Sequence, residues 1–439
     1  GLNIKDNLSK AAWCVSSQDD IRYKTEDFLS DLKEIPYETL YGDRLINNLL
    51  TVVHPFAFYG DMNSAYKLLI ELKKYLELKE NKSPSLLNES SYFSGIGHIS
   101  LTFFLLQAIN SGLIDTSKTP VSLIYDKKRV KNKEYASLIA ERCKDYGVKL
   151  IEPFEGIKKQ YDLGLWPISQ NNQNRYVIAT HFYTSSYQQS ILGSQKLILR
   201  PNKNHIEIGK KIIKENFTNI PRWFVGMHLR TAQDSNTLRN ANIENCQLAI
   251  NKINSLGGCV FLTGTKSNRR VYSKLNSCFD ITKLELNEYE LECLSIYIWS
   301  HSQFFIGSLS GGTFPPTTFG VPTIWLDCHP NANYRAPNPL DIILPKKVFS
   351  KRKKRFLSFE ESISKSHRFC QTENYDIAKE YGYYIHKVSF DLIDLAIDKI
   401  KNVKERNLTQ AIDHPNVLNY LPLHSGGEIL TESSLKKNK

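Results

Sequence analysis

The sequence lacks the features of a membrane-spanning, zinc-bound or disulfide-stabilised protein. No window approaches the ~18 uninterrupted apolar residues that a transmembrane helix needs, and the first residues show no charged-then-apolar signal pattern. The eight cysteines include no CxxC pair and no Cys/His spacing typical of a metal site. We therefore expect a reducing compartment and a cytoplasmic chain.

Methionine and sequence repeats are also scarce. Met62 and Met227 are the only methionines and the chain begins at Gly1, so we expect a processed or cloned start. What is present is a globular composition, because 439 residues with 41% hydrophobic content suffice for two or three domains of about 150 residues. The net charge of +12 favours anionic partners such as nucleotides, nucleic acid or acidic lipids.

Hydrophobic periodicity divides the chain into four expected parts. Residues 1–89 have apolar residues at helical spacing and predict an all-α segment. Strands and helices then alternate over 90–215, where the expected strands include VSLIYD, VKLIE, RYVIATHFY and QKLIL. A second alternating unit covers 216–345 and ends with PTIWLD as its final strand. Residues 346–439 predict a basic run, helices and a polar, frayed tail.

The two alternating units predict an α/β fold. Strand and helix alternation is typical of a parallel, doubly wound sheet, so we expect two Rossmann-like domains in tandem.

Polar residues follow the expected strands of the second unit. The stretch FVGMHLR ends on His228 and Arg230, and later strands are followed by Thr263, Gly264 and the turn from Ser308 to Thr313. Ligands bind beyond the carboxyl ends of strands in open α/β sheets, and backbone amides of glycine-rich turns approach phosphates closely. These residues indicate a nucleotide-diphosphate site. The alternatives are a capped structural pair at His228 and Arg230 and a tight strand-to-helix turn at Gly311 and Gly312.

Three stretches carry a resemblance to known enzymes: FVGMHLR with the following RNAN, GGCVFLTG, and FFIGSLSGGTFPPTTFGVPTIWLD. Together they resemble a bacterial family of glycosyltransferases of the GT-B architecture, distantly similar to fucosyltransferases that use GDP-fucose. The resemblance covers roughly residues 91–400. It implies that two Rossmann-like domains face each other across a cleft, with the acceptor on 90–215 and the sugar nucleotide on 216–345. It also implies sugar transfer to a glycan or glycolipid in bacterial surface polysaccharide or capsule synthesis.

The resemblance places Arg230 on the donor diphosphate and the Ser/Thr-Gly turn beside the nucleotide. The order HLRTAQDSNTLRN departs from the basic and acidic run common in those fucosyltransferases, which leaves the donor base and sugar open, with GDP slightly favoured. The expected donor-binding residues are Arg230, Arg239, Asn240, Thr263, Gly264, Ser308, Ser310, Gly311, Gly312 and Thr313.

Catalysis by inversion needs a base for the acceptor hydroxyl. The candidates are His98, in a glycine-rich turn of the first unit, with Asp234 and His228. A structural role for His98, bonded to backbone, is an equal alternative. Weaker candidates are His54, Asp61 and His181.

No metal or cofactor is expected. No two aspartates lie two positions apart, so the D-x-D metal motif of the other main glycosyltransferase architecture is absent from the sequence. Arg230 and helix dipoles would instead neutralise the leaving diphosphate.

The run KKVFSKRKKR, residues 346–355, contains seven basic residues. A solvated loop is the commoner explanation of such a run. The alternative is peripheral contact with the anionic inner face of a membrane, or with an acidic glycan acceptor. Two rival functions stay open for the chain: a noncatalytic transferase-like module whose helical segment recruits partners, and a nucleic-acid protein. The latter is disfavoured because no basic and aromatic stripe follows a strand pattern.

Overall fold

The structure is a computed structural model of the whole chain. It describes residues 86–88, 96–110, 121–125, 128, 130–151, 165–170, 173–178, 198–218, 220–230, 237–329, 340–359, 361–362, 375–401 and 428–436. Within these ranges no helix has both the length and the apolar character to cross a membrane. Of the expected helical segment 1–89, residues 1–85 and 89 lie outside the described residues.

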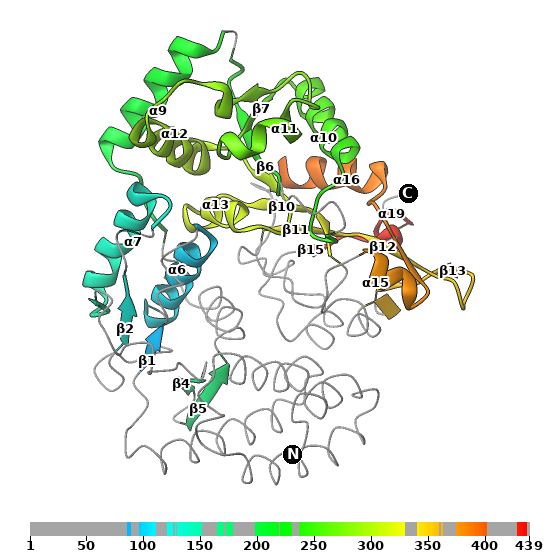
Figure 1. Cartoon of the computed structure of the whole chain (residues 1–439), viewed down its shortest axis with the longest axis horizontal. Coiled ribbons are helices and arrows are strands. Elements are labelled where there is room, and N and C mark those ends of the chain that lie inside the picture. The colour runs from blue at the N-terminus through cyan, green and yellow to red at the C-terminus, as the bar shows by residue number, and fades with distance from the viewer. Residues whose placement is uncertain are drawn as a thin grey trace, which may run out of the picture.

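A seven-stranded sheet forms the centre of the second unit, and all of its neighbouring strands are parallel (Figure 1). Its order is β15-β11-β10-β9-β6-β7-β8. The strands are β6 (Phe224–His228), β7 (Cys259–Leu262), β8 (Phe279–Asp280), β9 (Phe305–Gly307), β10 (Thr323–Cys328), β11 (Ile342–Pro345) and β15 (Glu428–Ile429). The chain runs outward from β6 through β7 to β8, then returns to β9 on the other side of β6. This is the doubly wound, Rossmann-like order that the sequence predicted.

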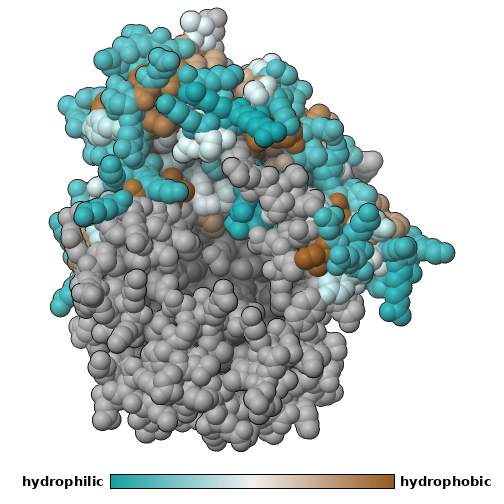
Figure 2. All heavy atoms as spheres, in the orientation of Figure 1, coloured by the Kyte–Doolittle hydropathy of each residue, from teal (hydrophilic) through white to brown (hydrophobic). Residues whose placement is uncertain are grey.

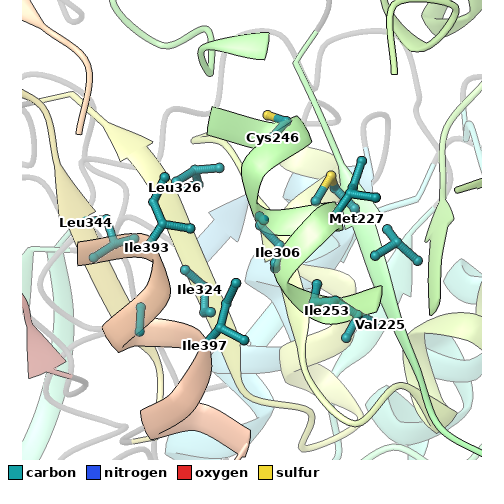
Figure 3. Packing of buried hydrophobic residues seen from close by; sticks show 14 of the residues in the cluster. Val225, Met227, Cys246, Ile253, Ile306, Ile324, Leu326, Leu344, Ile393 and Ile397 are labelled. Atoms are coloured by element: carbon teal, nitrogen blue, oxygen red, sulfur yellow. The ribbon is translucent and has the colours of Figure 1, made fainter. Parts of the chain in front are cut away.

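Two amphipathic helices cover one face of this sheet. They are α10 (Ile243–Ser255), which follows β6, and α16 (Phe390–Lys401). Figure 3 shows aliphatic side chains of both helices packed onto alternate residues of the strands, such as Val225 and Met227 of β6. Because successive strand residues point to opposite faces, only every second residue joins this cluster.

The opposite face is covered by α9 (Lys203–Asn216) and α12 (Glu288–His301). Both helices begin at an asparagine, Asn202 and Asn287, whose side chain accepts a hydrogen bond from the third helical residue. Leu294 and Ile298 of α12 pack on Phe261 of β7. The result is a three-layer α/β arrangement, and the predicted strands and helices from β6 to β10 are confirmed. Shorter elements complete this unit: η3 (Lys266–Asn268), α11 (Arg269–Tyr272), η4 (Ile281–Lys283), η5 (Gly311–Thr313) and α13 (Pro315–Thr318).

The first unit has a smaller parallel sheet of β1 (Leu86–Asn88), β2 (Val121–Ile124) and β3 (Lys149–Ile151). Its helices are α6 (Ile96–Asn110) and α7 (Lys133–Asp145). The strands at VSLIYD and VKLIE are thus confirmed. The boundary expected at residue 89 is too late, however, because β1 already belongs to the sheet.

Helix α7 joins the two units through a shared core. The ring of Tyr135 meets that of Trp299 of α12 edge-on, with ring centroids 5.6 Å apart, and its hydroxyl donates to Thr318 Oγ1 at 3.1 Å. The carboxylate of Glu292 accepts a hydrogen bond from the backbone N–H of Glu134 at 2.9 Å. Residues of α6, α7, α12 and β10, with Phe314 and Phe319 on either side of α13, therefore form one continuous hydrophobic cluster.

Two strand predictions of the first unit need correction. The strand at RYVIATHFY is present as β5 (Gln173–Ile178), but it pairs antiparallel with β4 (Leu165–Gln170) in a separate hairpin. At QKLIL, the described residues Ile198 and Leu199 are not in a strand. The backbone N–H of Leu199 donates instead to Thr318 O at 2.8 Å. Alternating apolar residues alone could not distinguish these arrangements.

The second unit extends beyond the expected boundary at residue 345. Strand β10 is not the last, since β11 and β15 continue the sheet, and Leu430 after β15 is fully buried. The end of the chain also forms α19 (Glu432–Lys436), so the expected frayed tail is wrong for residues 428–436. The sequence analysis missed strand β15 because it contributes only two residues to the sheet.

The basic run forms a β-hairpin rather than a loop. Strands β12 (Lys347–Ser350) and β13 (Arg355–Phe356) pair antiparallel, and β14 (Tyr383–His386), which follows α15 (Tyr375–Glu380), pairs with the other edge of β12. The hydrophilic projection on the right of Figure 2 lies where Figure 1 labels β13. Residues 351–354 at the tip are exposed.

Candidate functional site

The candidate site lies where the strand order reverses, between the carboxyl ends of β6 and β9. The backbone N–H of Ser308 donates to His228 O at 3.3 Å, and the backbone N–H of Arg230 donates to Ser308 Oγ at 2.8 Å. The end of one central strand is therefore tied to the start of the loop after the other. A topological switch point of this kind is where open α/β sheets bind ligands.

The turn after β9 uses its hydroxyl groups to hold its own shape. Thr313 Oγ1 donates to Ser308 O at 2.7 Å, and Ser310 Oγ lies 3.4 Å from Thr313 Oγ1. The side chains of Ser308 and Thr313 are fully buried. The predicted residues are thus gathered at one place, but Ser308 and Thr313 shape the turn from within it.

The imidazole of His228 packs directly on Gly312 of this turn. A Cβ atom at Gly312 would lie 2.5 Å from His228 Nε2, so no side chain fits there while the ring keeps its place. His228 Nδ1 donates to Thr263 O at 3.0 Å, which fixes the neutral tautomer with Nε2 as acceptor. Burial lowers the pKa of His228, and the bond to Thr263 offsets part of that shift.

The end of β7 packs closely behind His228. Thr263 is buried and its hydroxyl donates to Met227 O at 3.3 Å. Gly264 has φ 154°, in the region that favours glycine, and a Cβ there would lie 2.6 Å from Asn268 Oδ1. The amide of Asn268 in turn donates to Leu229 O at 3.1 Å. Thr263 and Gly264 therefore support the end of β6.

Arg239 reaches the same turn from the loop after β6. Its Nε donates to Leu309 O at 3.2 Å. The backbone beside it is held by Lys346, whose Nζ donates to Leu238 O and Asn240 O, both at 2.7 Å. The structure thus brings Arg239 and Asn240 to the switch point. Lys346 is buried, so this member of the basic run is a structural residue rather than a surface charge.

Asp327 at the end of β10 lies at this edge of the sheet, and the sequence analysis missed it. It has φ 51° and lies where the pairing of β10 with β11 shifts register. Leu326 packs under α10 and α16, and the bulge turns the next side chain to the same side. Its carboxylate accepts from the backbone N–H groups of Asn242, at 2.8 Å, and Val388, at 3.0 Å. Asp327 thereby joins the starts of both helices to the strand.

His329, two residues further, was also missed. Its side chain is 1% exposed, and neither ring nitrogen has a hydrogen-bond partner among the described residues. Burial, together with the positive charges of Lys346 and Arg239, lowers its pKa to about 3. The stretch WLDCHP carried the signal for both residues, because polar side chains at a strand end were the criterion applied to the other strands.

Of the three candidate bases, the structure places His228 at this point. His98 lies in the first turn of α6 rather than in a turn before the helix. Asp234 lies outside the described residues, as do the weaker candidates His54, Asp61 and His181. In the described part of the chain, no three His, Cys, Asp or Glu side chains are grouped as a metal site would require. The six cysteines described there are free thiols.

Comparisons with known proteins returned matches among solved structures. No family model matches the chain, and no curated protein does. A family 9 glycosyl transferase from Veillonella parvula aligns with TM-score 0.42 and 13% identity, over 72% of this chain and 96% of its own. ADP-heptose LPS heptosyltransferase II of E. coli aligns with TM-score 0.31 and 9% identity, over 55% and 83%. The iron-containing heptosyltransferase TibC, in complex with ADP-heptose, aligns with TM-score 0.33 and 12% identity, over 72% and 76%.

Proposed function

We propose that the chain is a glycosyltransferase that moves a sugar from a nucleotide-sugar donor to a glycan or lipid-linked glycan. Bacterial surface polysaccharide synthesis, including capsule, is the process that the sequence resemblance suggests. The observation that carries the proposal is the placement of Arg230 and Arg239 at the switch point of the seven-stranded sheet, on the turn from Ser308 to Thr313.

The two arginines suit the negative charge of a diphosphate. Arg230 is anchored through its backbone N–H, which donates to Ser308 Oγ, and Arg239 Nε donates to Leu309 O of the same turn. A guanidinium forks onto phosphate oxygens, and the hydrogen bonds are charge-assisted. The site can therefore stabilise a leaving diphosphate without a metal ion.

In the transfer, the acceptor hydroxyl oxygen forms a bond to the anomeric carbon of the sugar. The bond from that carbon to the diphosphate breaks, and the diphosphate leaves with the electron pair. The hydroxyl proton goes to a base, for which His98, Asp234 and His228 remain the candidates. His228 has the tautomer for this role, because Nδ1 is bound to Thr263 O and the lone pair is on Nε2.

The nucleotide and sugar remain to be assigned. The sequence resemblance favours GDP, whereas E. coli heptosyltransferase II is named for ADP-heptose and TibC was solved in complex with it. A thermal-shift panel of GDP, UDP, CMP and ADP tests the proposal. We expect one nucleotide to raise the melting temperature in a concentration-dependent way, because a ligand that binds only the folded state stabilises it. A chain that responds to none of the four would contradict the donor site and favour the noncatalytic, partner-recruiting module.

Contact with an anionic membrane is a second part of the proposal, and the β12–β13 hairpin is its surface. Lys353 and Arg355 are paired with Glu361, and Lys347 with Glu432. The tip residues without an ion pair among the described residues are Lys351, Arg352 and Lys354. At about 1 kcal/mol for each cation, the attraction is weak and sensitive to salt.

Sedimentation with vesicles tests this contact. We expect binding to vesicles containing phosphatidylserine at low salt, and its loss when the three tip cations are changed to alanine. Equal binding to neutral vesicles would contradict an electrostatic contact.

A further inference from the structure

His329 is the one buried histidine at the carboxyl edge of the described sheet whose two ring nitrogens have no hydrogen-bond partner among the described residues. A neutral imidazole offers one donor and one acceptor. Burying both without partners is unfavourable, so the fold keeps a polar ring where an apolar one would be more stable. Such a cost is typical of a residue retained for a ligand.

The surroundings of the ring select the charge of that ligand. Among the described residues, the charges that lower the pKa of His329 are both positive, from Lys346 and Arg239. Lys346 uses its three N–H groups on Leu238 O, Asn240 O and Tyr375 OH, so its charge reaches the site but its hydrogens do not. Arg239 is bound to Leu309 O in the turn of the switch point. An anionic oxygen at His329 would be attracted by both cations.

We propose that His329 donates a hydrogen bond to a phosphoryl oxygen of the ligand at the switch point, with Arg239 on the same anionic group. The assignment rests on the proposed donor site and extends it from β6 and β9 to the end of β10. Lys346 acts as a positioning residue, since it holds the backbone on both sides of Arg239 and contributes a field.

The experiment compares two buried histidines. His329→Phe keeps the ring shape and removes the nitrogens, and His329→Gln keeps a donor. His205 is the matched control, because it is equally buried but its Nε2 contacts Glu134 Oε2 at 3.0 Å. Isothermal titration with pyrophosphate and with the nucleoside diphosphate that stabilises the wild type most gives the affinities, and thermal melting gives the stability.

We expect His329→Phe to melt at or above the wild-type temperature while binding both anions about ten- to a hundredfold more weakly. His329→Gln should recover part of the affinity, and it gives the affinity readout if the phenylalanine variant does not fold. His205→Phe should melt lower and bind as the wild type does. Wild-type affinity in His329→Phe, or in His329→Ala where only the latter folds, would overturn the inference.

The two proposals fail in different ways. If pyrophosphate binds the wild type but not His329→Phe, and no nucleoside adds affinity, the anion contact stands and the nucleotide-sugar function falls. If a nucleoside diphosphate binds both proteins equally, only the role of His329 falls. If the wild type binds neither anion, both are overturned.

Discussion

Asp327 and His329 are buried polar residues at the same edge of the seven-stranded sheet, and they differ in their hydrogen-bond partners. Asp327 accepts hydrogen bonds from Asn242, Asn245 and Val388, all within the chain. His329, two residues away, has no such partner among the described residues. Both side chains are almost fully buried.

This difference separates scaffold from site. A buried charge whose hydrogen bonds are made within the protein holds elements together, and removing it leaves its partners unsatisfied. A buried polar group without internal partners lowers the stability of the fold, and its hydrogen bonds are made only when a ligand binds. The same test places Ser308 and Thr313 with the scaffold, although their sequence pattern suggested ligand contacts.

The largest expected effect is on the scaffold side. Asp327→Ala should lower the free energy of unfolding by about 3 to 5 kcal/mol. The substitution removes the carboxylate that faces the buried charge of Lys346 and accepts the backbone N–H at the start of α10. Urea unfolding at neutral pH measures the loss. Asp391→Ala, which removes an exposed carboxylate from the first turn of α16, is the control and should cost less than about 1 kcal/mol.

A double variant sharpens the assignment. Asp327→Asn with Lys346→Met removes both buried charges, so its loss should be smaller than the sum of the two single losses. Strict additivity would show that the two charges do not interact, and Asp327 would then be a helix-start acceptor only.

The central sheet was predictable because its signals are local. In FVGMH, CVFL and TIWLDC the short apolar runs are bounded by glycine, proline or polar residues, and helices with 3.6-residue periodicity separate them. The edge strand β15 and the hairpin β4–β5 were not assigned correctly, since their places depend on which distant segment they pair with. No spacing within a short window contains that information.

The site was predictable in position and less so in role. Placing His228, Arg230 and the turn after β9 together needed only the rule for carboxyl strand ends, and the structure joins all three. Burial and strand register decide which hydroxyl groups, such as those of Ser308 and Thr313, form hydrogen bonds within the protein rather than with a ligand. The scaffold role of Lys346 was hidden in a run of basic residues that otherwise lies on a hairpin.

On the site side, the largest expected effect belongs to Arg230. Arg230→Ala should weaken nucleoside diphosphate binding by about 1.5 to 3 kcal/mol, the range for hydrogen bonds to charged groups, while the fold changes little in stability. Arg230→Lys should restore only part of the affinity, because a point charge cannot reproduce the bidentate fork. Titration calorimetry and melting temperature on the same proteins give both quantities.

Arg352→Ala is the matched charge control, since it removes a cation from the exposed hairpin tip and should leave nucleotide affinity unchanged. A lowered melting temperature with unchanged affinity in Arg230→Ala would place Arg230 with Asp327 on the scaffold side. A structure of a ligand complex tests the geometry. If the Arg230 guanidinium lay more than about 7 Å from the turn of residues 308–313, the two could not bind the same phosphate.

Because His329 is buried, it should make the free energy of unfolding depend on pH. Burial, Lys346 and Arg239 together lower its pKa to about 3, so above that pH the folded protein binds no proton there, whereas the unfolded chain binds one below about pH 6.5. Protonation of the unfolded chain at this histidine therefore costs the fold little above about pH 6.5, and the free energy of unfolding falls as the pH is lowered towards 3. Between pH 6.5 and 5 the loss should be roughly 1.5 kcal/mol. Urea unfolding of His329→Phe over the same range should lack this component; an unchanged pH dependence would contradict a buried neutral imidazole.

The smallest expected effect concerns metal. Nucleotide binding and sugar transfer should survive EDTA, because the sequence has no D-x-D motif and Arg230 and Arg239 supply positive charge at the proposed diphosphate site. Titration of the nucleoside diphosphate before and after chelation should give the same affinity. Loss of binding after EDTA that manganese or iron restores would show that a cation shares the diphosphate with the arginines. In that case Arg230→Ala should weaken binding less in the presence of the metal than in its absence, because the ion would carry part of the neutralising charge.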